Sequence, residues 1–130
     1  MLKITKTAEY ALIAIKHMSN KEAICSSNHI ANQYNIPKEI MAKTLQKLSK
    51  KKYINAVKGP KGGYSVKNSI KNINLIEFIE DIEGPVGIST CSKNEECNLI
   101  DCCNIKDPIN KINNNIKNIL SRVKLKDIAF

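Results

Sequence analysis

Four cysteines lie close together in the last third of the sequence. Five residues separate Cys91 from Cys97 and five separate Cys97 from Cys103, while Cys102 is adjacent to the last of these. Thiolates are soft ligands that suit zinc and iron–sulfur clusters. Structural zinc sites usually carry two CxxC-like pairs, and this sequence has none. The pattern leaves three kinds of chemistry open: an iron–sulfur cluster, a zinc site, or reversible thiol oxidation.

The fifth cysteine and the two histidines lie outside this loop. Cys25 is far from the other four, and we expect it to be a small buried hydrophobic residue. His17 and His29 fall within predicted helices, where packing or surface roles are expected. Because Cys102 adjoins Cys103, one backbone direction rarely aims both thiols at the same centre. Only one of the two therefore needs to be a ligand.

The chain is strongly basic. It has 130 residues, 21 of them Lys or Arg, and a formal net charge of +9. Such an excess favours a polyanionic partner such as nucleic acid. Arg122 is the one arginine. Since arginine is the usual bidentate reader of guanine, few base contacts of that kind are available.

Size and hydropathy exclude several classes of protein. A chain of this length forms one modest core with little room for a substrate cavity, so we expect neither an enzyme nor a small-molecule substrate. The longest unbroken apolar run, residues 10–15, is far below the roughly 20 residues that span a bilayer. Lys3, Lys6 and Glu9 interrupt the N-terminus, which has no signal-peptide pattern. We expect a cytoplasmic protein with no membrane partner. Disulfides are rare in that compartment, which favours metal or redox roles for the clustered cysteines.

The first half of the chain predicts a helix-turn-helix. A first helix is predicted over residues 7–19, with Thr7 as its N-cap. Ser27 can cap a short second helix, and Asn35 tolerates the left-handed conformation of a tight turn. Pro37 suits the first turn of the next helix, which runs to about residue 50. Two helices joined by so short a turn follow the helix-turn-helix plan.

The second helix of this motif lies in the major groove of DNA, with its N-terminal residues nearest the bases. Its predicted core-facing residues are Ile40, Met41, Leu45 and Leu48. The residues expected to contact DNA from its other face are Lys38, Glu39, Ala42 and Lys43. The lysines can meet phosphate or guanine, and the glutamate can accept a hydrogen bond from cytosine.

Residues 53–66 predict a β-hairpin directly after this helix. Residues 53–57 and 64–66 favour strands, and the tip 59–63 is dense in glycine and other turn residues. A slim tip can lie against a minor groove or the phosphate backbone. The hairpin residues expected to contact DNA are Lys58, Lys61 and Gly62.

The remaining residues predict two further helices around the cysteine loop. One opens at residues 74–77 with a spacing like that of a capping box, packs through Ile76, Ile79 and Ile82, and ends at Gly84. The last starts near residues 107–108. A stripe of apolar residues spaced by three and four marks one face of it: Ile105, Ile109, Ile112, Ile116, Ile119, Leu120 and Val123. So apolar a face predicts dimerisation.

Together these features predict a mainly α fold with a small β wing, that is, a winged helix-turn-helix followed by a long C-terminal dimerisation helix. The expected division is a DNA-binding domain over residues 1–86, a cysteine cluster-binding loop over 87–104, and a dimerisation helix with the C-terminal segment over 105–130.

The order of motifs resembles a known family. Residues 4–11 precede the helix-turn-helix, residues 59–64 form a Gly-Pro-Lys-Gly-Gly-Tyr wing, and residues 83–85 read Glu-Gly-Pro before the three spaced cysteines and the long helix. In this order the chain resembles the IscR/NsrR/RirA family of winged-helix regulators over essentially its whole length. Residues 36–43 and 83–86 are most similar to the regulators of the SUF iron–sulfur assembly operon.

The resemblance implies a homodimer that binds a palindromic operator in double-stranded DNA and responds to an iron–sulfur cluster, either [2Fe-2S] or [4Fe-4S]. The family's cluster cysteines match Cys91, Cys97 and Cys103. In several relatives an acidic residue of the other subunit is the fourth ligand, and Glu9 stands at that position. The implied function is regulation, most simply repression, of genes for iron–sulfur assembly or iron homeostasis in response to cluster status, iron, redox or nitric oxide stress.

Two departures keep other interpretations open. The histidine that follows the third cysteine in IscR-like members falls at Lys106, which cannot ligate a metal while protonated, and Cys102 is additional to the pattern. Both affect the fourth ligand and the cluster type. The alternatives are a zinc- or thiol-based redox-sensing regulator and a metal or cluster carrier. A carrier would need the cysteines but not the basic helix and hairpin.

Overall fold

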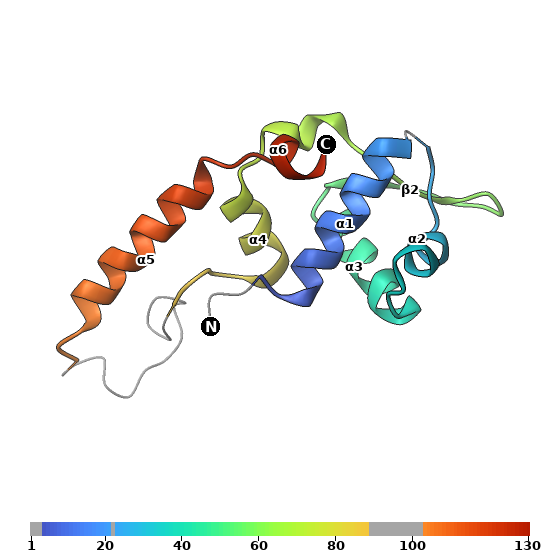
Figure 1. Ribbon diagram of the computed structural model, residues 1–130. Helices are drawn as coiled ribbons and strands as arrows, with labels where there is room; N and C mark the ends of the chain where they lie inside the picture. The colour runs from blue at the N-terminus through green and yellow to red at the C-terminus, as the bar shows by residue number, and fades with distance from the viewer. Residues whose placement is uncertain (1–3, 22, 89–102) are drawn as a thin grey trace.

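The computed structural model describes residues 4–21, 23–88 and 103–130. Helices dominate these residues, and their one sheet has two antiparallel strands (Figure 1). The predicted fold class, mainly α with a small β wing, is confirmed. In chain order the elements are α1 (Lys6–Lys21), α2 (Ser27–Tyr34), α3 (Lys38–Lys50), β1 (Ile54–Val57), β2 (Gly63–Val66), the 3-10 helix η1 (Asn68–Asn72), α4 (Leu75–Glu83), α5 (Lys106–Ser121) and α6 (Leu125–Ala129).

The helix-turn-helix surrounds an apolar core. Ile15 of α1 and Ile30 of α2 are fully buried, as are Met41, Leu45 and Leu48 on one face of α3. Burying side chains of this size stabilises the fold by about 1.5–3 kcal/mol each. This packing holds α3 against α1 and α2 and leaves the opposite face of α3 to solvent.

The N-caps lie one or two residues ahead of the predicted positions. Ser26, and not Ser27, caps α2, since its hydroxyl accepts a hydrogen bond at 3.1 Å from a backbone N–H one turn later. Thr5, and not Thr7, does the same for α1, with its hydroxyl 3.4 Å from the backbone nitrogen of Ala8. In each case two nearby hydroxyl residues had the right chemistry, and the extension of each helix toward its N-terminus selected the earlier one.

The tight turns behave as their residue types require. Asn35 adopts the predicted left-handed conformation, with φ 54° and ψ 41°, and directs the buried Ile36 inward. Lys52 has a φ of 67° where α3 turns into β1, a conformation that non-glycine residues rarely adopt. Lysine offers no sequence signal for such a turn, and the sequence did not predict it.

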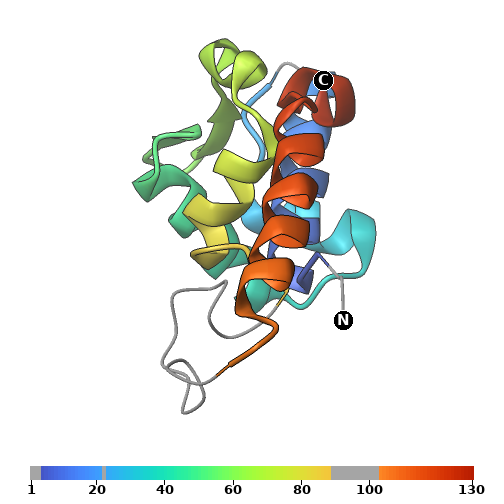
Figure 2. The same ribbon diagram turned by 90° about the vertical axis from the view of Figure 1, so that its left-hand side faces the viewer.

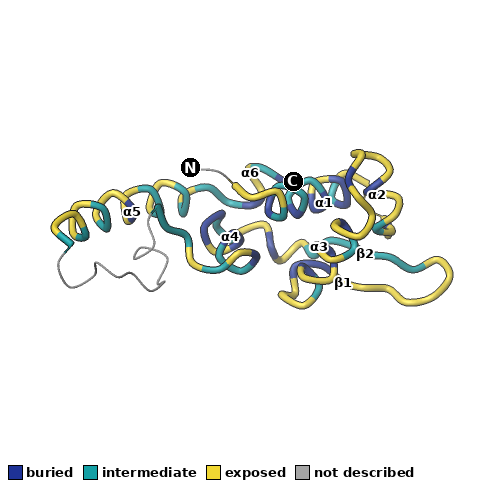
Figure 3. The backbone as a smooth tube through the Cα atoms, turned by 90° about the horizontal axis from the view of Figure 1, so that it is seen from below, coloured by how far each residue is buried: buried dark blue, intermediate teal, exposed yellow. Residues whose placement is uncertain are grey.

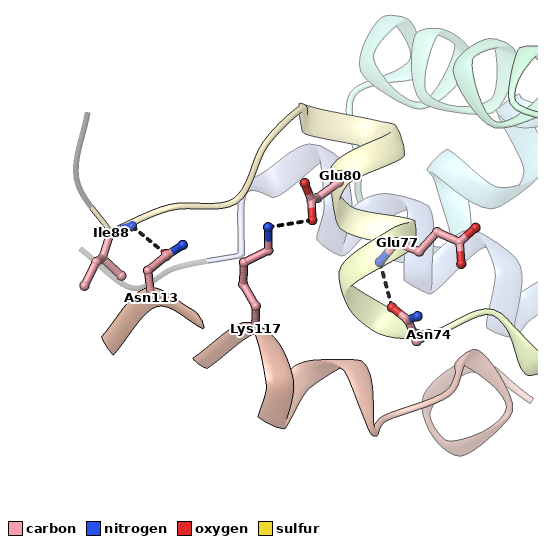
Figure 4. Close-up of polar contacts among 6 residues, drawn as sticks. All are labelled: Asn74, Glu77, Glu80, Ile88, Asn113 and Lys117. Atoms are coloured by element: carbon pink, nitrogen blue, oxygen red, sulfur yellow. Dashed lines mark hydrogen bonds and ion pairs between the residues drawn. The ribbon is translucent and has the colours of Figure 1, made fainter. Parts of the chain in front are cut away.

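Helix α4 follows its predicted plan. The side chain of Asn74 accepts a hydrogen bond at 2.8 Å from the backbone N–H of Glu77, which caps the helix (Figure 4). The three predicted isoleucines are buried, together with Leu75 and Phe78. Gly84 ends the helix with a φ of 91°.

The C-terminal segment differs from its prediction, because the chain breaks after α5 and forms a separate helix, α6. The break is stabilised by backbone pairing, in which the N–H of Leu75 donates to the carbonyl of Val123 at 2.8 Å. Helix α6 then packs on α1, where the hydroxyl of Ser19 donates to the carbonyl of Ala129 at 2.9 Å. Sequence periodicity missed α6 because a helix of one turn carries almost no repeat.

Helix α5 projects from the helical body and lies beside α4 (Figures 1 and 2). Ile105, Ile112 and Ile119 are exposed by 57%, 49% and 63%, whereas Asn113 is the one buried residue of the helix. The predicted apolar stripe is therefore left largely uncovered within a single chain.

His17 lies buried between α1 and α2, with 4% of its surface exposed. Its Nδ1 is 2.9 Å from the Tyr34 hydroxyl, and its Nε2 is buried without a hydrogen-bond partner among the described residues. Burial lowers the pKa of the imidazole, and the nearby side chains of His29 and Lys21 lower it further. The neutral form is thus the one that fits.

This site predicts an acid-sensitive fold. A histidine whose pKa is lower in the folded state stabilises the protein fully above its unfolded pKa of about 6.5. That contribution is lost as the pH falls below this value. Urea unfolding between pH 7.5 and 5.5 should show a smaller loss of unfolding free energy for His17→Gln than for the wild type. His29→Gln should give an intermediate slope, because it removes one of the causes that lower the His17 pKa, and equal slopes for all three proteins would contradict the prediction.

Candidate functional site

Helix α3 presents a polar, basic face to solvent. The predicted DNA-contact residues Lys38, Glu39 and Lys43 are exposed, and Ala42 is half-buried beside them. Ile40 was expected in the core, and that expectation is wrong, since it is 43% exposed. The buried residues of α3 are Met41, Thr44, Leu45 and Leu48. These four residues fill one arc of the helix, and Ile40 falls just outside that arc. Thr44, one turn later, lies inside it.

The hairpin forms the predicted wing. Strands β1 and β2 pair in the register Ile54↔Val66 to Val57↔Gly63, and the turn between them is exposed (Figure 3). Lys58 and Lys61 lie in this turn, as predicted for groups that meet DNA. A side chain at Gly62 would overlap the carbonyl of Val57, so the tip can be this narrow only with glycine there.

A short strand segment at Cys25 joins the wing to the helix-turn-helix. The N–H of Cys25 donates to the carbonyl of Tyr64 at 2.9 Å, and the N–H of Tyr64 donates to the carbonyl of Cys25 at 2.8 Å. A Cβ at Gly63 would lie 2.5 Å from the Cys25 carbonyl oxygen. The sequence gives no sign of this bridge, because a single bridging residue leaves no alternating pattern.

A hollow of about 460 Å³ lies between the wing and the N-terminal end of α2. Lys21, Lys61 and His29 line it, together with the capping residue Ser26. Its positive charge suits a phosphate backbone, which lysines and helix N-termini both attract.

The basic groups of this surface are not neutralised internally. Within the described parts of the chain, ion pairs join Lys6 to Glu9 and Lys117 to Glu80, and the lysines of α3 and the wing form none. Unpaired lysines around a groove raise the local potential and attract polyanions. The net charge of +9 is thus concentrated in part where α3 and the wing meet solvent.

Of the candidate cluster ligands, the structure describes only Cys103 and Glu9. Cys91, Cys97 and Cys102 lie outside the described residues. Cys103 is half-buried, just before α5. Glu9 lies in the first turn of α1, with its side chain 44% exposed and 3.1 Å from the ammonium of Lys6. Among the residues that the structure describes, no three metal-binding side chains converge.

Cys25 has the role expected of it. It is buried, and its thiol donates a weak hydrogen bond to the carbonyl of Ala23 at 3.6 Å. Burial raises the pKa of the thiol, which keeps it protonated and unreactive. His17 packs in the core and His29 lies at the surface, as the sequence indicated.

The segment that enters the cysteine loop is attached to α5. The side-chain oxygen of Asn113 accepts a hydrogen bond at 3.2 Å from the backbone N–H of Ile88 (Figure 4). One turn later, Lys117 pairs with Glu80 of α4 at 3.3 Å. Since Cys103 leads directly into α5, both the entry and the exit of the loop are held to one helix.

An exposed basic helix beside a narrow wing, at one end of a helical body, defines the class of winged helix-turn-helix DNA-binding regulators. The chain belongs to the Rrf2 family, whose model is described as an iron-dependent transcriptional regulator and matches residues 4–130. It is accordingly a transcription regulator and not an enzyme. No helix among the described residues is long and apolar enough to cross a membrane.

Two relatives illustrate the likeness in sequence. The HTH-type transcriptional regulator NsrR of Bacillus licheniformis is 26% identical over 133 residues, which cover 99% of this chain and 93% of the relative. A second relative, from Aquifex aeolicus, is described as an HTH-type transcriptional regulator and is 35% identical over 75 residues. That match covers 57% of this chain and spans about half, 52%, of the length of the relative.

Solved structures share the fold. CymR (YrzC), the global cysteine regulator of B. subtilis, has a TM-score of 0.74 at 23% identity, covering 99% of this chain and 97% of that one. IscR of T. potens has a TM-score of 0.71 at 20% identity, with coverages of 97% and 85%. The family-level resemblance read from the sequence is confirmed. Because these names include both a cysteine regulator and IscR, likeness alone does not select the signal.

The candidate interface predicts a defined response to salt. Lys43→Ala and Lys61→Ala should each weaken DNA binding, and loss of a phosphate contact should lower the slope of log K against log salt by about one. Fluorescence anisotropy of labelled duplexes across a salt series would measure both quantities. Lys126→Ala, an exposed change on α6, is the matched control. Wild-type affinity in both test variants would show that DNA lies elsewhere.

Proposed function

We propose that this chain is a homodimeric repressor that binds a palindromic operator through α3 and the wing, and that an iron–sulfur cluster on the cysteine loop sets its occupancy. The observation that carries the proposal is an unneutralised basic α3 beside a wing that Cys25 and Tyr64 fix to the segment leading into α2. The regulated genes would be those of iron–sulfur assembly or iron homeostasis.

The DNA contacts divide by element. Helix α3 would enter the major groove with Lys38, Glu39, Ala42 and Lys43 toward the base edges. The narrow tip would place Lys58, Lys61 and Gly62 against the backbone or the adjacent minor groove. These contacts are supported by the exposure of the lysines and glutamate and by the shape of the tip.

Dimerisation is supported by the surface of α5. Ile105, Ile112 and Ile119 repeat every seven residues, and the half-buried Ile109 and Ile116 fall between them. Apolar residues spaced alternately by three and four form the seam of paired helices. A second copy of α5 would cover this seam and place two copies of α3 on one face of DNA.

The proposed cluster ligands are Cys91, Cys97 and Cys103, with Glu9 of the second copy as the fourth. The donor set fits in its chemistry, since the thiolates are soft ligands and the carboxylate is a harder, weaker one. The structure supports the availability of Glu9, because its pair with Lys6 is exposed and an exposed pair is released at little cost. When bound, the cluster supplies a labile centre whose loss reports on iron, oxygen or nitric oxide.

The mechanism would be linkage between the loop and α3. Glu9 follows Ala8 in α1, and the side chain of Ala8 is completely buried. Helix α1 in turn packs on α3. A bond that holds Glu9 would restrain α1 and through it the recognition helix. If the loaded and apo dimers differ in operator affinity, gain or loss of the cluster shifts occupancy by that difference.

One experiment tests the whole proposal. Operator fragments bound by the apo protein and by anaerobically reconstituted protein should give two distinct affinities. Equal affinities would contradict cluster control while leaving DNA binding intact. A reconstituted protein that holds zinc, or a change in affinity on thiol oxidation alone, would favour the zinc- or thiol-based regulator. Failure to bind DNA, together with transfer of a cluster to other proteins, would favour the carrier.

The dimer seam predicts the effect of charge at its centre. The double variant Ile112→Lys, Ile116→Lys should be monomeric and should bind operator DNA far more weakly, since each charge would be buried without a partner. Light scattering gives the mass, and circular dichroism checks that the monomer is folded. Lys111→Ala, on the exposed side of the same helix, should stay dimeric. A monomeric wild type would rule out this seam.

The fourth ligand predicts a contrast between two positions. Glu9→Ala should change the visible spectrum of the reconstituted cluster or speed its loss, because one iron loses its carboxylate. Glu9→Cys should slow the loss, since a thiolate binds more tightly. Cys102→Ala should change little. A cluster lost in Cys102→Ala and untouched in Glu9→Ala would assign the ligand to Cys102 instead.

A further inference from the structure

The exposed side chains on the first turns of α3 include an unexpected apolar group. Ile40 is 43% exposed, and the half-buried Ala42 lies two residues later. Of the large apolar residues that the described chain exposes, Ile40 is the one on α3, whereas Ile112 and Ile119 belong to the seam of α5. An isoleucine exposed on this basic face is available to contact an apolar group of a bound partner.

Ile40 shares one ridge of the helix with two lysines. Lys43 and Lys47 follow it at intervals of three and four residues, and both are exposed. The carbonyl of Ile40 accepts a hydrogen bond at 2.8 Å from the hydroxyl of Thr44, which is buried. Packing thus fixes the backbone at Ile40 while its side chain projects beside the lysines. One isoleucine among lysines is too small a patch to dock a protein.

The chemistry of α3 restricts which bases it can read. It has no arginine and no asparagine, so guanine can be contacted only by its lysines and adenine only by its one amide, Gln46. Apolar side chains distinguish one feature of the major groove, the C5-methyl group of thymine. We infer that Ile40 is a specificity-determining residue that contacts a thymine methyl group in each half-site, so that the operator carries an A·T pair at that position. This inference rests on the proposed DNA-binding function.

The test compares thymine with uracil, which pairs identically but lacks the methyl group. Selection from a random duplex library first gives the operator. Single dT→dU replacements are then scanned through one half-site, with wild type and Ile40→Ala. For one replacement the wild type should lose about fourfold in affinity, the value of one buried methyl or methylene group. Ile40→Ala should bind the thymine operator more weakly and lose nothing further on that replacement.

Three controls separate the possible outcomes. Ile4→Ala changes another exposed isoleucine, outside α3 and outside the hollow beside the wing, and should respond to uracil as the wild type does. Ile40→Val keeps a branched apolar group and should retain the discrimination, and circular dichroism confirms folding of each variant. If the wild type binds its operator but loses nothing at any uracil, or Ile40→Ala loses as much as the wild type, the inference is wrong while DNA binding stands. If the library yields no bound duplex, the proposed function itself fails.

Discussion

The two hydrogen bonds between Cys25 and Tyr64 join the parts of the molecule that must act together. A two-stranded hairpin alone is marginally stable in water and would point in no fixed direction. Pairing with the segment that leads into α2 adds a third stretch of backbone to the hairpin. This pairing orients the hairpin relative to α3. The approach is close enough that residue 63 must be glycine, because any Cβ there would meet the Cys25 carbonyl. The angle between recognition helix and wing therefore depends on backbone contacts and not on the lysines that both elements display.

A second set of contacts connects that unit to the rest of the chain through α4. The hydroxyl of Tyr53, just before β1, donates to a carboxylate oxygen of Asp81 at 2.5 Å, and the Tyr53 ring packs edge-on against Phe78. The opposite side of α4 pairs with α5 through Glu80 and Lys117. Helix α4 thus lies between the base of the wing and the helix that holds the cysteine loop. A displacement of α5 would be transmitted to β1 through these contacts, since well-packed interiors deform little.

The parts of the fold that the sequence predicted are those with a period or a special residue type. The faces of α3 and α4, the left-handed Asn35 and the glycine-rich tip all follow from local chemistry. The missed features depend on tertiary context. Ile40 has a core-like residue type, yet Thr44 satisfies its hydroxyl on the backbone and takes the buried position. The bridge at Cys25 and the one-turn α6 leave no repeat to detect. For the candidate site, exposure of the lysines agrees with the prediction, whereas the ligand roles of Cys91 and Cys97 fall outside the described residues.

The anchoring of α5 at its middle and beyond its C-terminal end has a geometric consequence. The helix is held by Ile88 and Glu80 near its middle, and the backbone at Val123 and the packing of α6 on α1 hold the segment beyond its end. Its 16 residues make a strut of about 24 Å. If two such struts pair, the distance between the two α3 helices would be a fixed property of the dimer, and it would have to match the spacing of the two half-sites. The dimer would then bind only operators whose half-sites have the matching spacing. An operator whose half-sites were moved apart by half a helical turn would present the same bases on the wrong side of the duplex.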